Sequence, residues 1–246
     1  QDLGEKNFSG SNLSSSSFEN ANLSRANLSG ASLRDSLMTG ANLQESNLSG
    51  ANMAGCNLAG ANCRQTNMTG VNLRDANLQS VTFDESNLLG ANLRGTNLSS
   101  SSLNRVDAKG ANLREANLGS ANAEESDFQG VNLRDADLSH TQLSRINLSG
   151  ANLRDANMEN LVMREATLAG ANLKGASIVN AVLTNSNFEG ANLYDANLQG
   201  ADCNGMNVDD AYLIDCVMPD GNAYEAGMDV TTFGMHGTPN DNRSSN

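Results

Sequence analysis

The sequence contains few of the residues that build most globular cores and binding sites. Of 246 residues, 4% are aromatic, none is tryptophan, two are proline and 17% are charged. No apolar run approaches the roughly 20 residues of a membrane span, and no signal-peptide apolar segment opens the chain. Four cysteines are too few for a disulfide framework at this length. Acids outnumber bases by 28 to 15, and a net charge of −13 argues against direct binding to nucleic acid.

An unbroken five-residue repeat dominates what the chain does contain. Every fifth residue from Leu3 to Met218 is apolar, which makes 44 positions without insertion or deletion, and 27 of them are leucine. The residue two positions earlier is usually small, and the residue between them is most often asparagine. A period of five fits neither an amphipathic helix nor an ordinary strand. Because one unit buries so little, it must stack on copies of itself as a solenoid.

The individual units carry a family resemblance. Ala26-Asn27-Leu28-Ser29-Gly30 and Ala171-Asn172-Leu173-Lys174-Gly175 resemble the units of the pentapeptide-repeat proteins, and the resemblance extends over residues 1–218. The monotonous Ala-Asn-Leu units look most like those of cyanobacterial members. The resemblance implies an all-β fold, a right-handed quadrilateral parallel β-helix in which four units make one square coil. Coils of 20 residues would then number about 11.

A second period, of 20 residues, supports a four-sided coil independently. Glycine recurs at every twentieth position from Gly10 to Gly190, and we expect a corner there that only glycine fits without strain. Another column alternates in charge, so coils about 4.8 Å apart would bring opposite charges together. Such exposed pairs are worth about 0–1 kcal/mol each, so we expect them to set register more than stability. This charge ladder consists of Glu5, Arg25, Glu45, Gln65, Glu85, Arg105, Glu125, Arg145 and Glu165.

The volume of the interior must also be balanced from coil to coil. Ala108 lies one coil before Phe128 in the same column, and Ala123 is the preceding centre. We expect these two alanines to leave room for the ring of Phe128, because protein interiors are close-packed.

The pattern stops at Met218, so we divide the chain into a repeat domain, 1–218, and a tail, 219–246. The tail opens on the turn signal Pro219-Asp220-Gly221, and we expect its last ten residues to be disordered. The end of a solenoid exposes unpaired strand edges and needs a cap or a partner. We expect the tail to cap the last coil in part, through Met228, Val230, Phe233 and Met235. End-to-end or dimeric association remains open.

No catalytic, cofactor-binding or metal-binding motif is present. All four cysteines, Cys56, Cys63, Cys203 and Cys216, fall on inward positions. We interpret them as small core fillers rather than zinc ligands, because no histidine lies nearby. His140 and His236 have no nucleophile or metal ligand as a partner. We therefore expect a protein that is not an enzyme and that takes no cofactor.

One outward column is basic over most of its length. This arginine column consists of Arg34, Ala54, Arg74, Arg94, Arg114, Arg134, Arg154 and Lys174. The next column is acidic or glycine, from Asp35 to Asp215. Three interpretations stay open: a solvated face neutralised sideways by the acids, a linear basic strip for an acidic protein surface, or a phosphate site. Adjacent carboxylates would weaken any affinity for anions.

These features favour a rigid scaffold that presents ladder-like charged faces to an unidentified protein partner, without a membrane. The resemblance also offers an alternative, because members of the Qnr and MfpA type act as acidic mimics of DNA that inhibit or protect DNA gyrase. Three features of this chain fit that alternative poorly. Its repeats have no loops, its acids are interleaved with arginine, and no amphipathic helix for dimerisation follows them.

The cellular compartment does not follow from the sequence. The first residue is Gln1 rather than methionine, so we expect an upstream segment to have been removed or left out. The cytoplasm is favoured, and the periplasm or thylakoid lumen is the alternative if that segment is a signal peptide.

Overall fold

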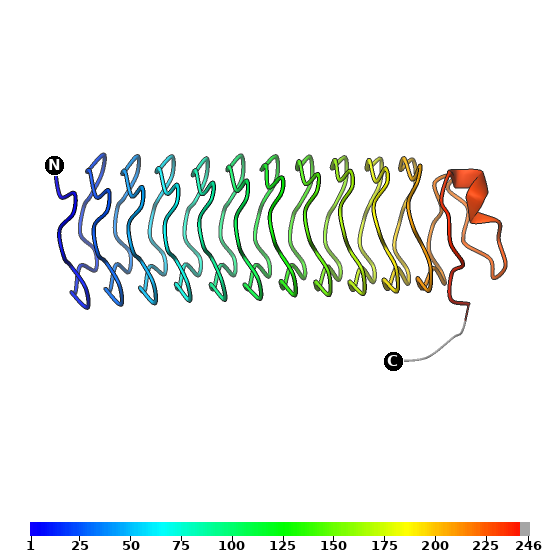
Figure 1. Cartoon of the computed structure of the whole chain (residues 1–246), viewed down its shortest axis with the longest axis horizontal. Helices are drawn as coiled ribbons and strands as arrows, with labels where there is room; N and C mark the ends of the chain where they lie inside the picture. Colours follow the sequence, from blue (N-terminus) through cyan, green and yellow to red (C-terminus); the bar gives the residue numbers. More distant parts are fainter. Residues whose placement is uncertain (242–246) are drawn as a thin grey trace.

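The computed structural model, which describes residues 1–241, is a straight rod with the N-terminus at one end and the tail at the other (Figure 1). Each residue at the middle of a side pairs in parallel with the residue 20 positions later, from Asp2 with Asn22 to Asn197 with Val217. Parallel pairing at this constant offset winds the chain into a right-handed quadrilateral β-helix. The expected fold class is confirmed. Among the described residues the one helix is the 3-10 helix η1, Val230–Phe233, and no helix could span a membrane.

Each side of the coil is a very short extended segment followed by a tight corner. Leu23 N–H donates to Asn42 C=O of the next coil at 2.7 Å, and Arg25 N–H donates to Gln44 C=O at 2.9 Å. Ala26 N–H then closes the corner by donating to Leu23 C=O at 3.1 Å. The bonds between coils recur at every side, so the backbone of one coil holds the next one in register.

Asparagine serves the corner and the stacking of coils at once. The side-chain oxygen of Asn72 accepts hydrogen bonds from Arg74 N–H and from Asn92 Nδ2, each at 3.3 Å. An amide suits the position because it accepts and donates together. Bonds from the Nδ2 of one coil to the Oδ1 of the coil before it connect a continuous column, which we name the asparagine ladder: Asn52, Asn72, Asn92, Asn112, Asn132 and Asn152.

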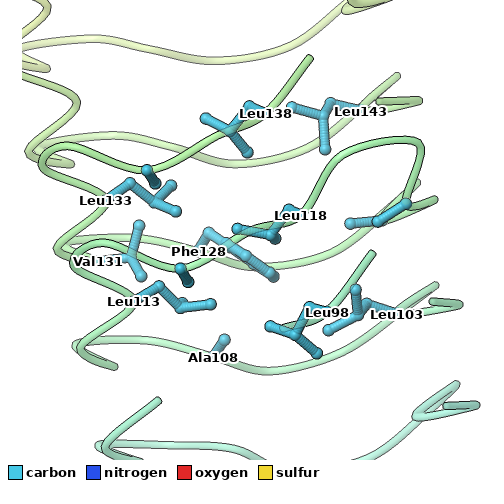
Figure 2. Packing of buried hydrophobic residues seen from close by; sticks show 14 of the residues in the cluster. Leu98, Leu103, Ala108, Leu113, Leu118, Phe128, Val131, Leu133, Leu138 and Leu143 are labelled. Atoms are coloured by element: carbon cyan, nitrogen blue, oxygen red, sulfur yellow. The ribbon is translucent and has the colours of Figure 1, made fainter. Parts of the chain in front are cut away.

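The interior is a continuous apolar core built from the two inward residues of each unit. Figure 2 shows leucine side chains of successive coils, such as Leu113 and Leu133, directed into the same interior. Phe128 is 2% exposed and lies in the coil next to Ala108, whose N–H donates to Asp127 C=O at 2.8 Å. Ala108 and Ala123 are both buried. That the two alanines leave room for the ring stays a prediction.

The glycine column lies at a corner whose backbone conformation favours glycine, as we expected, with φ between +61° and +66° at every member. A Cβ on any glycine from Gly10 to Gly190 in that column would meet nothing within 4 Å. The left-handed conformation is shared by other corners, with φ of +60° at Glu5 and +56° at Arg25. Glycine is therefore favoured by its backbone conformation and not by lack of space. Other residues also adopt the left-handed conformation, at a modest cost in free energy.

Replacing Gly110 with asparagine is accordingly expected to lower the free energy of unfolding by less than about 1 kcal/mol. Gly110 has φ of +62° and open space around it, and Asn160 already occupies a corner at φ +57°. Urea unfolding measures the difference. Gly110→Val is the control and should cost more, since β-branched residues resist the left-handed region. Equal and large losses for both variants would contradict an open corner.

The tail covers the C-terminal end of the rod, where Figure 1 shows η1 beyond the last coil. Val230 and Met235 are buried, and Met228 and Phe233 pack partly against the core. His236 pairs in parallel with Asn207, and Ala223 pairs in antiparallel fashion with Val217. The tail thus continues the hydrogen bonding of the coils by a route that does not repeat.

The tail is held in place further than we expected. Thr238 N–H donates to Asp209 Oδ1 at 2.9 Å, and Asn240 N–H donates to Ala211 C=O at 2.8 Å. Asp241 accepts hydrogen bonds from Tyr224 Oη at 2.8 Å and Gly227 N–H at 3.0 Å. The expectation of a disordered end is therefore wrong for residues 237–241, because they form hydrogen bonds with the last coil and with the rest of the tail. Residues 242–246 lie outside the described residues.

Candidate interaction surfaces

The arginine column lies along one corner of the rod, with one basic side chain on each coil from Arg74 to Lys174. The backbone sets this alignment, because Asp75 N–H donates to Arg94 C=O at 2.9 Å and Gly95 N–H donates to Arg114 C=O at 3.0 Å. The asparagine ladder lies beside it on the adjoining side, where Asn92 Oδ1 accepts from Arg94 N–H at 3.3 Å. Arginine, acid and amide side chains thus form three parallel columns.

Most of the arginine column is neutralised by the acidic column beside it. Arg74 and Arg154 each pair with the aspartate that follows them, at 3.1 Å in both cases. Arg94 reaches Glu115 on the next coil at 3.0 Å, and Arg114 contacts Glu115 at 3.0 Å and Asp135 at 3.3 Å. Arg134 pairs with Asp135 at 3.4 Å. No ion pair involves Arg34 in the described part of the chain. The column therefore offers alternating charges rather than a strip of one sign.

The charge ladder lies on the diagonally opposite corner, half a coil away. Arg25 lies 3.3 Å from both Glu5 and Glu45. Further along, Arg105 lies 3.7 Å from Glu85 and 3.0 Å from Glu125. Two further contacts join the ladder, between Arg145 and Glu125 at 2.7 Å and between Gln65 and Glu85 at 2.8 Å. Arg145 makes no ion pair with Glu165 in the described chain. Arg25 and Arg105 therefore bridge acids of the coils before and after them, whereas Arg145 pairs within the ladder only with Glu125 of the coil before it.

Glu125 is expected to titrate below the usual range of a glutamate. Hydrogen bonds from Arg105 and Arg145 lower the pKa of its carboxyl group from the ordinary value of 4.5. Because the pKa is lower in the folded chain, the stabilising contribution is present above the unfolded value and is lost as pH falls through the folded value. Carbon-13 NMR measures the titration. Arg105→Gln with Arg145→Gln should raise the pKa, and Arg34→Gln should leave it unchanged; no difference between the variants would contradict the pairing.

A shallow polar hollow opens beside the charge ladder. It is lined by Arg64, Asp84, Glu85, Asn104, Arg105, Glu124 and Glu125. Its charges are largely paired with one another, as in the 2.9 Å contact between Arg64 and Asp84. Within residues 1–241 no group of three or more histidine, cysteine, aspartate or glutamate side chains is arranged to hold a metal ion. The hollow thus has neither a free acid–base pair nor a metal cluster.

The four cysteines lie in the core, and the two histidines lie on the surface. All four thiols are buried, and burial raises the pKa of Cys56 to about 12, so this thiol stays protonated at neutral pH. Burial likewise raises the pKa of Cys203 and Cys216 to about 12. His140 and His236 are exposed at different places on the rod. These residues pack and solvate the fold.

One feature of the arginine column was missed in the sequence. Lys174 lies over the ring of Tyr194 on the next coil, with its Nζ 4.5 Å from the ring centre. The signal was present, since residue 194 follows Lys174 by 20 positions and ends the basic run with an aromatic side chain.

Comparison with known proteins places the chain among related sequences. A family model described as pentapeptide repeats (8 copies) matches it over six ranges, which are residues 7–40, 36–75, 76–114, 111–150, 146–185 and 176–215. Among curated proteins, no sequence matches the chain. The match indicates no catalytic family.

Several solved structures are similar to this chain. HetL, a pentapeptide repeat protein involved in heterocyst differentiation regulation in the cyanobacterium Nostoc sp. strain PCC 7120, is 32% identical over 89% of this chain and 92% of its own, with a TM-score of 0.47. A pentapeptide repeat protein of the Arabidopsis thaliana thylakoid lumen is 30% identical over 48% of this chain and 69% of its own, with a TM-score of 0.26.

A third structure shows the same fold at lower identity. QnrB1, a plasmid-mediated fluoroquinolone resistance protein, is 16% identical over 83% of this chain and 86% of its own, with a TM-score of 0.51. The family model spans most of the repeat domain, and HetL matches nearly the whole chain at 32% identity. This chain therefore belongs to the pentapeptide repeat family.

Proposed function

We propose that this protein is a non-enzymatic scaffold whose flat faces present columns of aligned side chains to a protein partner. The observation that carries the proposal is the constant offset of 20 residues between paired coils, which stacks like positions above one another along the rod. Backbone bonds between coils hold these columns in register, and the side-chain bonds of the asparagine ladder add to them. A surface of this kind is pre-organised, so binding to it orders few additional groups.

The face we propose combines the arginine column and the asparagine ladder. The arginines from Arg74 to Arg154 are paired with acids, so the face is close to neutral while it remains dense in hydrogen-bonding groups. A partner that recognises it needs complementary donors, acceptors and charges in a linear arrangement. Phosphate is a poor candidate because the adjacent carboxylates repel it.

The relative that is 32% identical gives the proposal some context. HetL is involved in regulating heterocyst differentiation, which is a role that a binding partner without catalysis can fill. No group of side chains in the described chain is set up for catalysis, as the paired charges of the hollow and the buried thiols indicate. A scaffold role in regulation is therefore the most economical function for this chain.

Affinity capture with matched charge variants tests the proposed face. The first variant replaces Arg74, Arg94, Arg114 and Arg134 with glutamine. The control replaces four arginines of the opposite corner, Arg64, Arg105, Arg145 and Arg164, so both variants lose the same charge. We expect a host protein that is recovered with the wild type and the control but lost with the first variant. Equal recovery with both variants, at equal thermal stability, would exclude the face.

DNA mimicry directed at gyrase is the alternative function. The likeness to QnrB1 supports the shared fold alone, because the identity is 16%. Along the middle of the rod the acids are paired with arginine, so no continuous row of free carboxylates resembles a DNA backbone there. We expect no inhibition of gyrase supercoiling at micromolar protein. Inhibition that disappears when exposed acids are replaced would favour the alternative.

A further inference from the structure

The arginine column changes its chemistry where it reaches the C-terminal end of the rod. After Lys174 the same column continues with Tyr194 and Ile214 on the following coils. Gly175 N–H donates to Tyr194 C=O at 3.0 Å and Asp195 N–H donates to Ile214 C=O at 3.2 Å, so the column stays in register. Tyr212 pairs with Asn192 on the adjoining side. Tyr194 is 37% exposed, and Tyr212 and Ile214 are half-buried.

The acidic column continues unchanged beside this apolar stretch, through Asp195 and Asp215. We name the five residues together the terminal patch: Tyr194, Asp195, Tyr212, Ile214 and Asp215. Both carboxylates are exposed, and neither lies within ion-pair distance of a lysine or arginine in the part of the chain that the structure describes. Earlier acids of the same column, such as Asp75 and Asp155, each pair with the arginine that precedes them. Tyrosine and isoleucine take that arginine's place in the terminal patch.

The surroundings of the terminal patch are strongly negative. Residues 175–241 contain ten aspartates and glutamates and no lysine or arginine, whereas residues 1–174 contain 18 acids and 14 bases. Residues 175–241 therefore carry a charge of −10, against −4 for the much longer stretch 1–174, so most of the net charge of −13 lies toward one end of the chain. A field of this kind attracts cations and repels nucleic acid and anionic membranes.

We propose that the terminal patch binds an arginine-rich segment of a protein partner, with guanidinium groups lying against the tyrosine rings and pairing with Asp195 and Asp215. The proposal deepens the scaffold function and rests on it. The molecule already shows both contacts with its own side chains: Lys174 lies 4.5 Å from the centre of the Tyr194 ring, and Arg154 pairs with Asp155 at 3.1 Å. Arginine supplies both contacts at once, because its planar head stacks on rings and binds carboxylates.

Other occupants fit the patch less well. A divalent cation would need clustered ligands, and no group of three or more potential ligands is arranged for a metal in residues 1–241. A second copy would have to offer its own arginine column, whose members from Arg74 to Arg154 are already paired with acids. A partner with unpaired arginines needs to break no ion pair of its own, although Lys174 already lies over the Tyr194 ring. Aromatic residues and arginine are also the residues that contribute most at protein interfaces.

The test is a binding titration of the full chain with a labelled peptide of four alternating arginine and serine pairs, followed by fluorescence anisotropy. Asp195→Asn with Asp215→Asn should weaken binding about fivefold. The control, Glu189→Gln with Asp210→Asn, removes the same charge from another corner at the same end and should change binding less than about twofold. Tyr194→Leu should weaken binding about threefold, and Tyr194→Phe, which keeps the ring, should not.

Each outcome decides the proposal. Equal losses for the two acid pairs would mean general attraction to a negative rod and would overturn it. Sedimentation of the free protein tests whether a second copy occupies the patch. A dimer that dissociates in Asp195→Asn with Asp215→Asn would also overturn the proposal. The titration needs no host partner. Its failure would therefore leave the capture experiment on the arginine column untouched, and the failure of that experiment would not affect the titration.

Discussion

Replacing Phe128 with alanine is expected to lower the free energy of unfolding by about 3–5 kcal/mol, measured by urea unfolding. The ring is 2% exposed and lies among leucines of its own and neighbouring coils (Figure 2). The coils around it are joined by backbone bonds such as Ala108 N–H to Asp127 C=O, so they cannot collapse into the cavity. Most of the lost contacts will therefore not be replaced.

A compensating pair of substitutions tests the volume argument itself. Ala108→Leu alone should destabilise the chain by about 1–3 kcal/mol, because the added side chain competes with the Phe128 ring. Ala108→Leu combined with Phe128→Leu should recover much of that loss, since leucine is the residue at 27 of the 44 centres. Losses that simply add would show that the two side chains do not share space.

Truncating the chain after Met218 is expected to convert a monodisperse rod into larger assemblies and to lower its melting temperature. The truncation uncovers the core under Val230 and Met235 and leaves the N–H groups of Val208 and Gly205 without their acceptors, His236 C=O and Gly234 C=O. Exposed strand edges of this kind pair with other chains. Sedimentation velocity measures the change in size.

A single substitution separates loss of the cap from loss of the tail. Val230→Asp places a charge at a position that is 3% exposed. This charge should displace the cap, since burying an unpaired charge costs well over about 1 kcal/mol. Ala226→Asp adds the same charge at an exposed site of the tail and is the control. Unchanged sedimentation for Val230→Asp and for the truncated chain would contradict the capping role.

The repeat domain was predictable because its rule is local. Each unit needs one small and one larger apolar side chain inward, so the five-residue period alone identifies the buried positions. The relation of Ala108 to Phe128 was visible for the same reason, since residues 20 apart are neighbours. The preference for glycine at position 110 was predictable and follows from its φ of +62°, but the open space around that corner was not.

Side-chain pairing and the tail followed the sequence less closely. Arg94 reaches Glu115 on the next coil because its own neighbour is Gly95, and such choices depend on the geometry of the corner. Asparagine occupies the middle position of 27 units. Its role could not be predicted, because the sequence does not show which backbone N–H groups lie within reach of its side chain. The tail makes contacts that do not repeat, such as Thr238 with Asp209, and no period indicates them.

The most direct test of the scaffold account measures distances along the rod. Spin labels would be placed on cysteines introduced at Ser29 together with Ser149 or Glu189, which lie on one corner six and eight coils apart. The native cysteines are buried, so they should resist labelling. Pulsed electron paramagnetic resonance should give narrow distributions centred near about 29 and 38 Å, in proportion to the number of coils. Broad distributions, or distances that do not grow in this proportion, would contradict a rigid scaffold.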